Sequence, residues 1–157
     1  MTSRHLVRSA LVGAASGAAG TTALNFASYL DMTWRARPAS STPEKTVEKL
    51  AELAGAEVPG EGEDRDNRLS GLGALSGIVT GVAVGAMYGV ARSLGLRPPV
   101  AVGSLVATAA VLLASNGPMT ALGITDPRTW GTSDWVSDVV PHLFYGVVTA
   151  ATAEAAS

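Results

Sequence analysis

Four long stretches of the chain consist of apolar and small residues with almost no charge. Residues 9–30, 69–91 and 98–125 carry no charged side chain, and residues 135–153 are interrupted only by Asp138 and His142. A helix needs about 20 mostly apolar residues to cross a bilayer. The pattern predicts an all-α fold, a four-helix transmembrane bundle with spans at about 9–32, 69–91, 98–117 and 135–155. We expect one integral membrane domain over residues 1–157.

A soluble helical bundle is the competing interpretation of these stretches. Its helices would show a polar stripe at the helical period. The second and third stretches show none, because their only polar side chains are serines, threonines and Asn116. The first stretch is the weakest and follows Arg4 and Arg8, so a cleaved signal peptide is an alternative for it.

The polar loop over residues 33–68 contains one segment with helical character, STPEKTVEKLAELAG. Thr42 suits an N-cap, Pro43 the first helical position and Gly55 the stop, which predicts a short amphipathic helix over 43–54. This helix would rest on the bilayer, dock on the bundle or stay solvated as a connector. The following PGEGEDRDNR predicts a flexible charged linker.

In the third stretch, Gly117-Pro118 predicts a break or early end of the helix.

Glycine recurs at every fourth position of the second stretch, at Gly73, Gly77, Gly81, Gly85 and Gly89. In water each interior glycine costs a helix about 1 kcal/mol relative to alanine. In lipid, small residues let helix backbones approach each other closely. The repeat therefore predicts a glycine zipper, a groove that receives another helix. Packing inside the bundle is the favoured interpretation, and a homo-oligomer interface and a pore lining are the alternatives.

Charge and composition narrow the environment and the partners. Charged residues make up 15% of the chain, eight of the thirteen acids lie between Glu44 and Asp66, and the net charge is −2. We therefore expect no nucleic-acid partner. The chain has no cysteine, which excludes disulfides and thiolate ligands. Lysine and arginine number four on the side of the termini and seven on the side of the polar loop. The count favours a cytoplasmic loop, but positive charge is denser on the terminal side, and both orientations stay open.

One polar cluster is a candidate for chemistry. Asp134, Asp138 and His142 are spaced four residues apart and Tyr145 continues the row, so they share one helix face. Ser133 is the expected cap of this helix, and Pro141 predicts a kink. The first helix brings Asp31 and Arg35 to the same side, and the third brings Asn116 there. The predicted cluster is thus Asp31, Arg35, Asn116, Asp138, His142 and Tyr145.

This cluster has three interpretations. A structural hydrogen bond that closes the mouth of the bundle is favoured. A relay for protons or ions is the second, because histidine titrates near neutral pH. Metal binding or catalysis is the third and weakest, because the chain has only two histidines. No phosphate-binding loop or nucleophile elbow is present. We expect no enzyme activity, no cofactor and no metal.

The segments SYLDMTWRARPASSTPEKTVEKLA, GITDPRTWG and DVVPHLFYG resemble small multi-pass membrane proteins of actinobacteria that have no assigned activity. The resemblance implies a plasma-membrane protein and transfers no functional residue. We expect a small structural or accessory component, in contact with the lipid bilayer and with either a second copy or another membrane protein. A small proton- or ion-coupled transporter or channel that uses Asp138 and His142 is the alternative.

Overall fold

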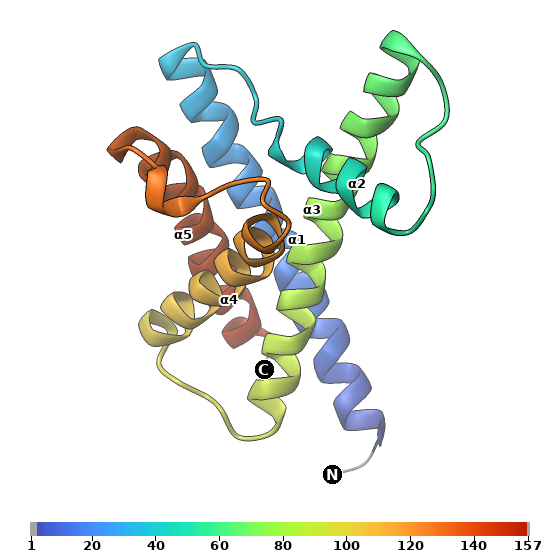
Figure 1. The fold of residues 1–157 in the computed structure, drawn as a ribbon. Coiled ribbons are helices and arrows are strands. Elements are labelled where there is room, and N and C mark those ends of the chain that lie inside the picture. Colours follow the sequence, from blue (N-terminus) through green and yellow to red (C-terminus); the bar gives the residue numbers. More distant parts are fainter. Residues whose placement is uncertain (1–2, 157) are drawn as a thin grey trace.

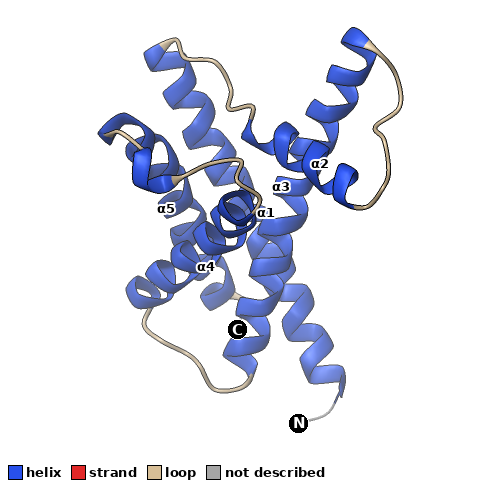
Figure 2. Cartoon of the chain, in the orientation of Figure 1, coloured by secondary structure: helices blue, strands red, loops and turns tan. Residues whose placement is uncertain are grey.

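A computed structural model describes residues 3–156 as an assembly of α-helices. The helices are α1 (Ser3–Arg35), α2 (Thr42–Leu53), α3 (Gly62–Ser93), α4 (Val100–Ala121) and α5 (Thr132–Ala155), with a 3-10 turn, η1, at Pro127–Thr129. No strand occurs over these residues, and the all-α prediction is confirmed (Figure 2).

Two long helices, α1 and α3, cross each other and define the frame of the molecule (Figure 1). α5 packs along α1, and α4 packs on α5 and on the C-terminal part of α3. The short helix α2 lies on the N-terminal part of α3. The start of α1, the α3–α4 turn and the end of α5 therefore share one end of the molecule, and α2 lies at the other.

Glycines bring the backbones of α1 and α3 into direct contact. A methyl group added at Gly17 would lie 2.5 Å from the carbonyl oxygen of Gly81 and 2.9 Å from Cα of Gly85. At Gly89, the same addition would lie 2.8 Å from Cα of Gly13. Real side chains do not occur at such distances, so this crossing requires glycine on both helices.

The predicted glycine row is divided among three environments. Gly81, Gly85 and Gly89 face α1, as internal packing requires. Gly73 is buried against Pro43 and Glu44 of α2, with which an added methyl group would make contacts of 3.2 Å. Gly77 faces no other atom within 4 Å. A single continuous docking groove for one helix is therefore the wrong description of the five glycines.

The other helix pairs also meet through small residues. Gly20 of α1 contacts Tyr145 and Thr149 of α5, and Gly146 of α5 contacts Ser104 and Thr108 of α4. Thr149 donates a hydrogen bond of 3.4 Å to the carbonyl of Ser16. Tyr145 is the largest fully buried side chain among the described residues, and its hydroxyl donates to the carbonyl of Gly81 at 2.6 Å.

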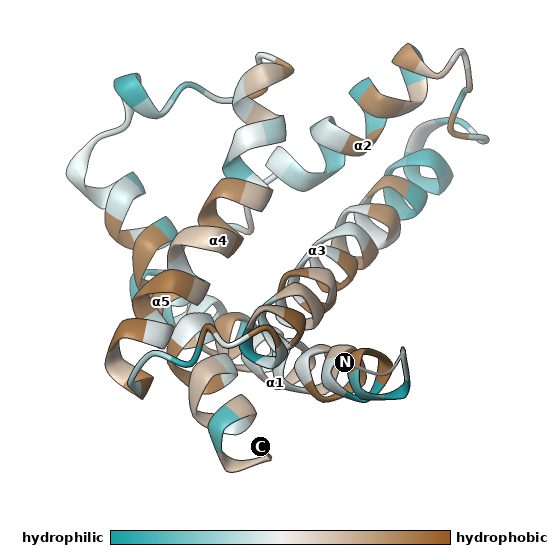
Figure 3. Cartoon of the chain, turned by 90° about the horizontal axis from the view of Figure 1, so that it is seen from below, coloured by the Kyte–Doolittle hydropathy of each residue, from teal (hydrophilic) through white to brown (hydrophobic). Residues whose placement is uncertain are grey.

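The interior is made of small residues and the surface carries the large apolar ones. The buried residues of α1 are Gly13, Ser16, Gly17, Gly20, Thr21 and Ala27. Those of α4 are Gly103, Ser104, Ala107, Thr108 and Val111. Exposed large side chains occur on all four long helices, among them Leu11, Phe26, Ile78, Val79, Met87, Leu105, Leu113, Phe144 and Val147. Figure 3 shows apolar residues along the length of α3 and α4, with hydrophilic residues gathered in the first turns of α3.

Among the described helices, α3 and α4 are the two that are long and apolar enough to cross a membrane. In each, about 28% of the most apolar window is buried within the molecule. α1 and α5 have sufficient length but fall below the same hydropathy requirement. Two of the four predicted spans therefore meet the requirement by composition and length.

Three local predictions need correction. The PGEGEDRDNR segment is not a flexible linker, because α3 begins at Gly62 and its acidic first turn favours the positive helix end. α4 does not break at Gly117-Pro118: it continues to Ala121, and the amide of Leu122 donates to the carbonyl of Pro118 at 2.9 Å. One proline removes a single helical donor, which this helix tolerates. Ser133 is not the cap of α5, because the helix begins one residue earlier, after Gly131.

The glycine crossing yields a stability test with a matched control. Gly85→Ala places a methyl group 2.6 Å from the amide nitrogen of Gly17, and we expect the free energy of unfolding to fall by about 1–3 kcal/mol. Gly77→Ala, on the same helix, adds its methyl group in open space and should be neutral or stabilising by up to about 1 kcal/mol. Thermal unfolding of the detergent-solubilised protein, followed by circular dichroism, compares the two. Equal melting temperatures for both variants would contradict the crossing.

Candidate functional site: a polar cluster between three helices

The candidate site lies on the first three turns of α5, where the ends of α1 and α4 approach it. Asn116 of α4 donates from its amide nitrogen to Oδ2 of Asp138 at 2.8 Å. Nε2 of His142 lies 3.3 Å from the hydroxyl oxygen of Ser115, also on α4. Two adjacent residues of α4 thus bind two residues of α5 that are one helical turn apart. This pairing holds the two helices at a fixed register.

The ring of His142 is oriented by its own helix. Nδ1 lies 2.6 Å from the backbone carbonyl oxygen of Asp138 and 3.6 Å from Oδ1 of the same residue. A carbonyl oxygen only accepts, so Nδ1 carries a proton. The neutral ring then presents Nε2 as an acceptor for the Ser115 hydroxyl, and the charged ring presents it as a donor. Ser115 suits either state, because its hydroxyl also lies 2.8 Å from the carbonyl of Val111.

A second group of charges surrounds Asp31 near the end of α1. Arg35 donates to both carboxylate oxygens of Asp31 at 2.6 Å, and Arg37 donates to the same carboxylate at 2.5 Å. Arg35 also donates to the hydroxyl of Ser133 at 2.7 Å and to that of Ser137. The arginine therefore connects α1 to the first turns of α5.

The structure divides the six predicted site residues into three sets. Asn116, Asp138 and His142 form one hydrogen-bonded group between α4 and α5. Asp31 and Arg35 form the second, which reaches α5 through Ser133 and Ser137. Ser137 and Asp138 are adjacent in sequence, so the two groups are neighbours on α5. Tyr145 belongs to neither, because its hydroxyl binds the carbonyl of Gly81 in the centre of the bundle.

Several polar partners in the structure have no distinctive signal in the sequence. Ser115, Ser133 and Ser137 are ordinary small residues of helices, and only their position opposite His142 or Arg35 gives them a role. Arg37 lies after the end of α1, where its residue type alone does not indicate a contact with Asp31. The ion pair between Arg92 and Glu154 joins α3 to α5 at the opposite end of the molecule. These residues are 62 positions apart, which sequence spacing does not connect.

The loop between α4 and α5 is held together by its own side-chain contacts. Asp126 accepts from the side chain and the backbone of Arg128, which holds the pKa of Asp126 below its usual value. Trp130 donates from its indole nitrogen to Thr125 at 2.9 Å, and its ring meets that of Trp135 edge to face with 5.0 Å between centroids. This compact loop places both tryptophans near the start of α5.

The donor set suits hydrogen bonding and proton exchange better than metal binding. Across residues 3–156 no three acidic or histidine side chains converge into a group that would hold an ion. Asp138 and His142 are one carboxylate and one imidazole, and the amide and hydroxyl beside them are weak ligands.

Comparison of the chain with known protein families, with characterised proteins and with solved structures gave no match.

The contact between Asn116 and Asp138 gives a second stability test. Asn116→Leu removes the donor and leaves a half-buried carboxylate without it, so we expect a loss of about 1–3 kcal/mol in the free energy of unfolding. Thr22→Val is a suitable control, because it removes an exposed hydroxyl that bonds only to its own helix at Ala18. Denaturation of both variants in the same detergent measures the difference. A loss no greater than that of Thr22→Val would show that the Asn116 amide does not support Asp138.

Proposed function

We propose that the chain is a multi-pass protein of the plasma membrane, a four-helix transmembrane bundle in which α1, α3, α4 and α5 all cross. The main observation is the distribution of side-chain size: most buried residues are glycine, alanine, serine and threonine, and most of the large apolar side chains are exposed. Leu113, for example, is 73% exposed, whereas Ala107 is fully buried. In water this arrangement would leave large apolar patches uncovered. In lipid it places large side chains against hydrocarbon and small ones between helices.

The positions of charged and aromatic residues support the same proposal. Along α3, the distance from Leu69 to Arg92 is about 35 Å at 1.5 Å per residue. Along α5, the distance from Trp135 to Glu154 is about 29 Å. Both lengths suit a hydrocarbon layer of about 30 Å crossed with some tilt. Trp34, Trp130 and Trp135 lie at the α2 end, as residues at a membrane interface do.

In this proposal α1 and α5 span the membrane beside α3 and α4 because they pack against them, although their own hydropathy is lower. The backbones of α1 and α3 touch at Gly13, Gly17 and Gly85, so α1 follows α3 through the layer. α5 is enclosed between α1 and α4 by Gly20 and Gly146. A helix that contributes many small residues to an interface has a low mean hydropathy even where it faces lipid on its other side.

The favoured activity within the membrane is that of a structural or accessory component that binds another transmembrane helix. The support is the segment of α3 over residues 74–79, in which six consecutive residues are exposed. More than a full helical turn there is exposed on every face. It contains Gly77, which offers the close backbone approach that transmembrane helix pairs use. Helix α2, with Leu50 and Leu53 exposed, borders this segment.

Mass measurement after purification in mild detergent tests this proposal. We expect the 15.8 kDa chain to require detergent and to carry a stoichiometric additional mass, either a second copy or another membrane protein. In Gly77→Leu this additional mass should be lost, because the larger side chain blocks the close approach of another helix at Gly77. In Leu113→Ala, on α4, the additional mass should still be present. A chain that is monodisperse in buffer without detergent would contradict the membrane location. If the unaltered chain and Gly77→Leu were both monomers in detergent, with no additional mass, the accessory role would be contradicted.

A proton relay is the second candidate function, favoured by the continuous set Asn116, Asp138, His142 and Ser115 between α4 and α5. A carboxylate and an imidazole on adjacent turns provide two sites for one proton. Proton flux into liposomes under a pH gradient distinguishes the candidates. The relay requires a flux that Asp138→Asn and His142→Ala each reduce at least tenfold, whereas the accessory role predicts the same background rate for all three proteins.

A further inference from the structure

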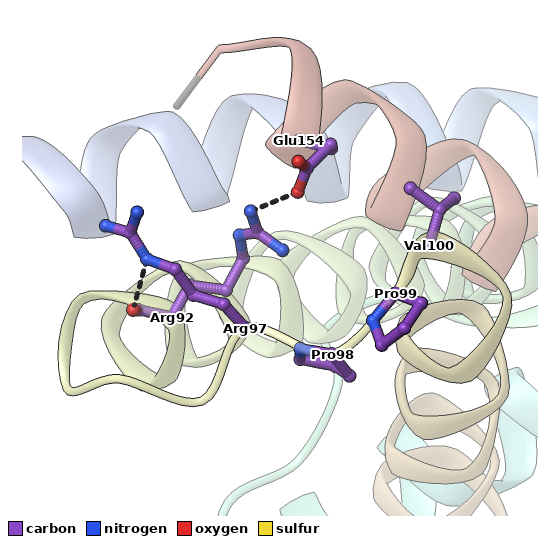
Figure 4. Close-up of a pocket in the computed structure, with 6 residues that line it drawn as sticks. All are labelled: Arg92, Arg97, Pro98, Pro99, Val100 and Glu154. Carbon is purple, nitrogen blue, oxygen red and sulfur yellow. Dashed lines mark hydrogen bonds and ion pairs between the residues drawn. The ribbon is translucent and has the colours of Figure 1, made fainter.

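A pocket opens at the end of the molecule opposite to the polar cluster. It has a volume of about 450 Å³ and is lined by Arg92, Arg97, Pro98, Pro99, Val100 and Glu154 (Figure 4). The lining comes from the end of α3, the α3–α4 turn and the last turn of α5. Because three helices end there, the pocket lies at the level where lipid headgroups begin in the proposed membrane arrangement.

Arg92 forms the inner wall of this pocket and is held in place. Its residue exposure is 6%, and its guanidinium pairs with the carboxylate of Glu154. The guanidinium carbon lies 6.0 Å from the ring centroid of Tyr88, one turn earlier on α3. The aromatic ring and the carboxylate therefore hold this buried guanidinium in one orientation, with its charge paired to Glu154.

Arg97 supplies a second positive charge from the rigid turn. Its Nε donates to the carbonyl oxygen of Arg92 at 3.2 Å, which ties the side chain to the end of α3. Gly95 has a φ of +103°, which a residue with a side chain rarely adopts, and the two prolines at 98 and 99 fix φ in the chain that leads into α4. The exposed Leu94 and Leu96 belong to this turn. The surface therefore combines a cationic recess with an apolar border.

The two ends of the molecule differ in charge. The pocket end holds four arginines, at positions 4, 8, 92 and 97, against one acid, Glu154, which gives a net charge of +3. The α2 end holds seven lysines and arginines against twelve acids, a net charge of −5. An anion is thus attracted to the pocket end and repelled from the other. The pocket contains two of these four arginines together with the acid, a net charge of +1.

We propose that this pocket binds the phosphate headgroup of an anionic phospholipid. The inference rests on the membrane location proposed above. Arg92 and Arg97 contact the phosphate oxygens, and arginine is suited to paired contacts with such groups. Val100, which lines the pocket at the start of α4, lies beside the acyl chains. A soluble phosphate gains the same charge contacts but not the apolar ones, so the intact lipid is the ligand.

Glu154 sets the affinity of this site. Its side chain is 53% exposed, and it occupies the guanidinium of Arg92 that the phosphate would use. A lipid phosphate therefore competes with this carboxylate. Removing the negative charge should strengthen lipid binding, an effect that misfolding does not produce.

Native mass spectrometry of the full chain in mild detergent, titrated with phosphatidylglycerol or phosphatidylcholine, tests the site. We expect one phosphatidylglycerol to bind in preference to phosphatidylcholine. Arg97→Gln should weaken this binding about fivefold, since an arginine near an anionic surface contributes about that factor. Glu154→Gln should strengthen it by a similar factor. Arg8→Gln at the same end and Arg128→Gln at the other remove the same charge outside the pocket and should change binding less than twofold.

Each remaining outcome overturns a defined part of this inference. Equal binding of the two lipids excludes recognition of an anionic headgroup. Equal losses in Arg97→Gln and Arg8→Gln exclude the pocket and leave only diffuse attraction. Displacement of the bound lipid by equimolar inorganic phosphate excludes the role of the acyl chains. Failure of the membrane location itself is distinguishable, because the chain would then be monodisperse without detergent.

Discussion

The close approach of α1 and α3 is the contact on which the rest of the structure depends. Glycine on both helices removes every side chain from the crossing, so that backbone meets backbone at Gly13, Gly17 and Gly85. α5 then packs against α1 at Gly20, and α4 packs against α5 at Gly146. A larger residue at the first crossing would separate α1 from α3 and displace Tyr145, whose hydroxyl binds the carbonyl of Gly81. The polar cluster depends on this order of packing, because it requires α1, α4 and α5 to converge.

An interior built of glycine and other small residues is stabilised differently in water and in hydrocarbon. In water, small buried residues would contribute little hydrophobic free energy, and the exposed leucines and valines would remain uncovered. In hydrocarbon, close packing and hydrogen bonds between helices supply the attraction instead. The buried hydroxyls of Thr21, Thr108 and Thr149 each donate to a backbone carbonyl, so none requires water. The large residues on the outside then need no protein partner.

The sequence predicts the helices and their small faces well, because these features depend on local spacing. The segment 43–54 corresponds to α2, although the helix begins at Thr42 and its N-cap is Ser41 instead of the expected Thr42. Gly55 has the positive φ of +66° that a helix stop uses. The division of the glycine row does not follow from spacing. Gly73 is buried because α2 folds back onto α3, and Gly77 is exposed because α1 diverges from α3 before reaching it. The contacts of the serines with Arg35 and His142 could not be predicted from the sequence either, because serine is common in helices. Such a serine gains a partner only where the fold places a second helix with a polar side chain opposite it. The resemblance to small actinobacterial membrane proteins remains an expectation.

Site-directed spin labelling tests most directly whether hydrocarbon surrounds the large exposed residues. The chain has no cysteine, so single cysteines at Leu11, Met87, Leu105 and Phe144 label one position each. In bilayers, our account predicts that oxygen, which concentrates in hydrocarbon, relaxes all four labels more strongly than a water-soluble nickel complex. Labels at Glu63 and Arg128 should show the reverse preference. If the nickel complex relaxed the labels at Met87 and Leu105 as strongly as the label at Arg128, water would surround these helices and the account would be wrong.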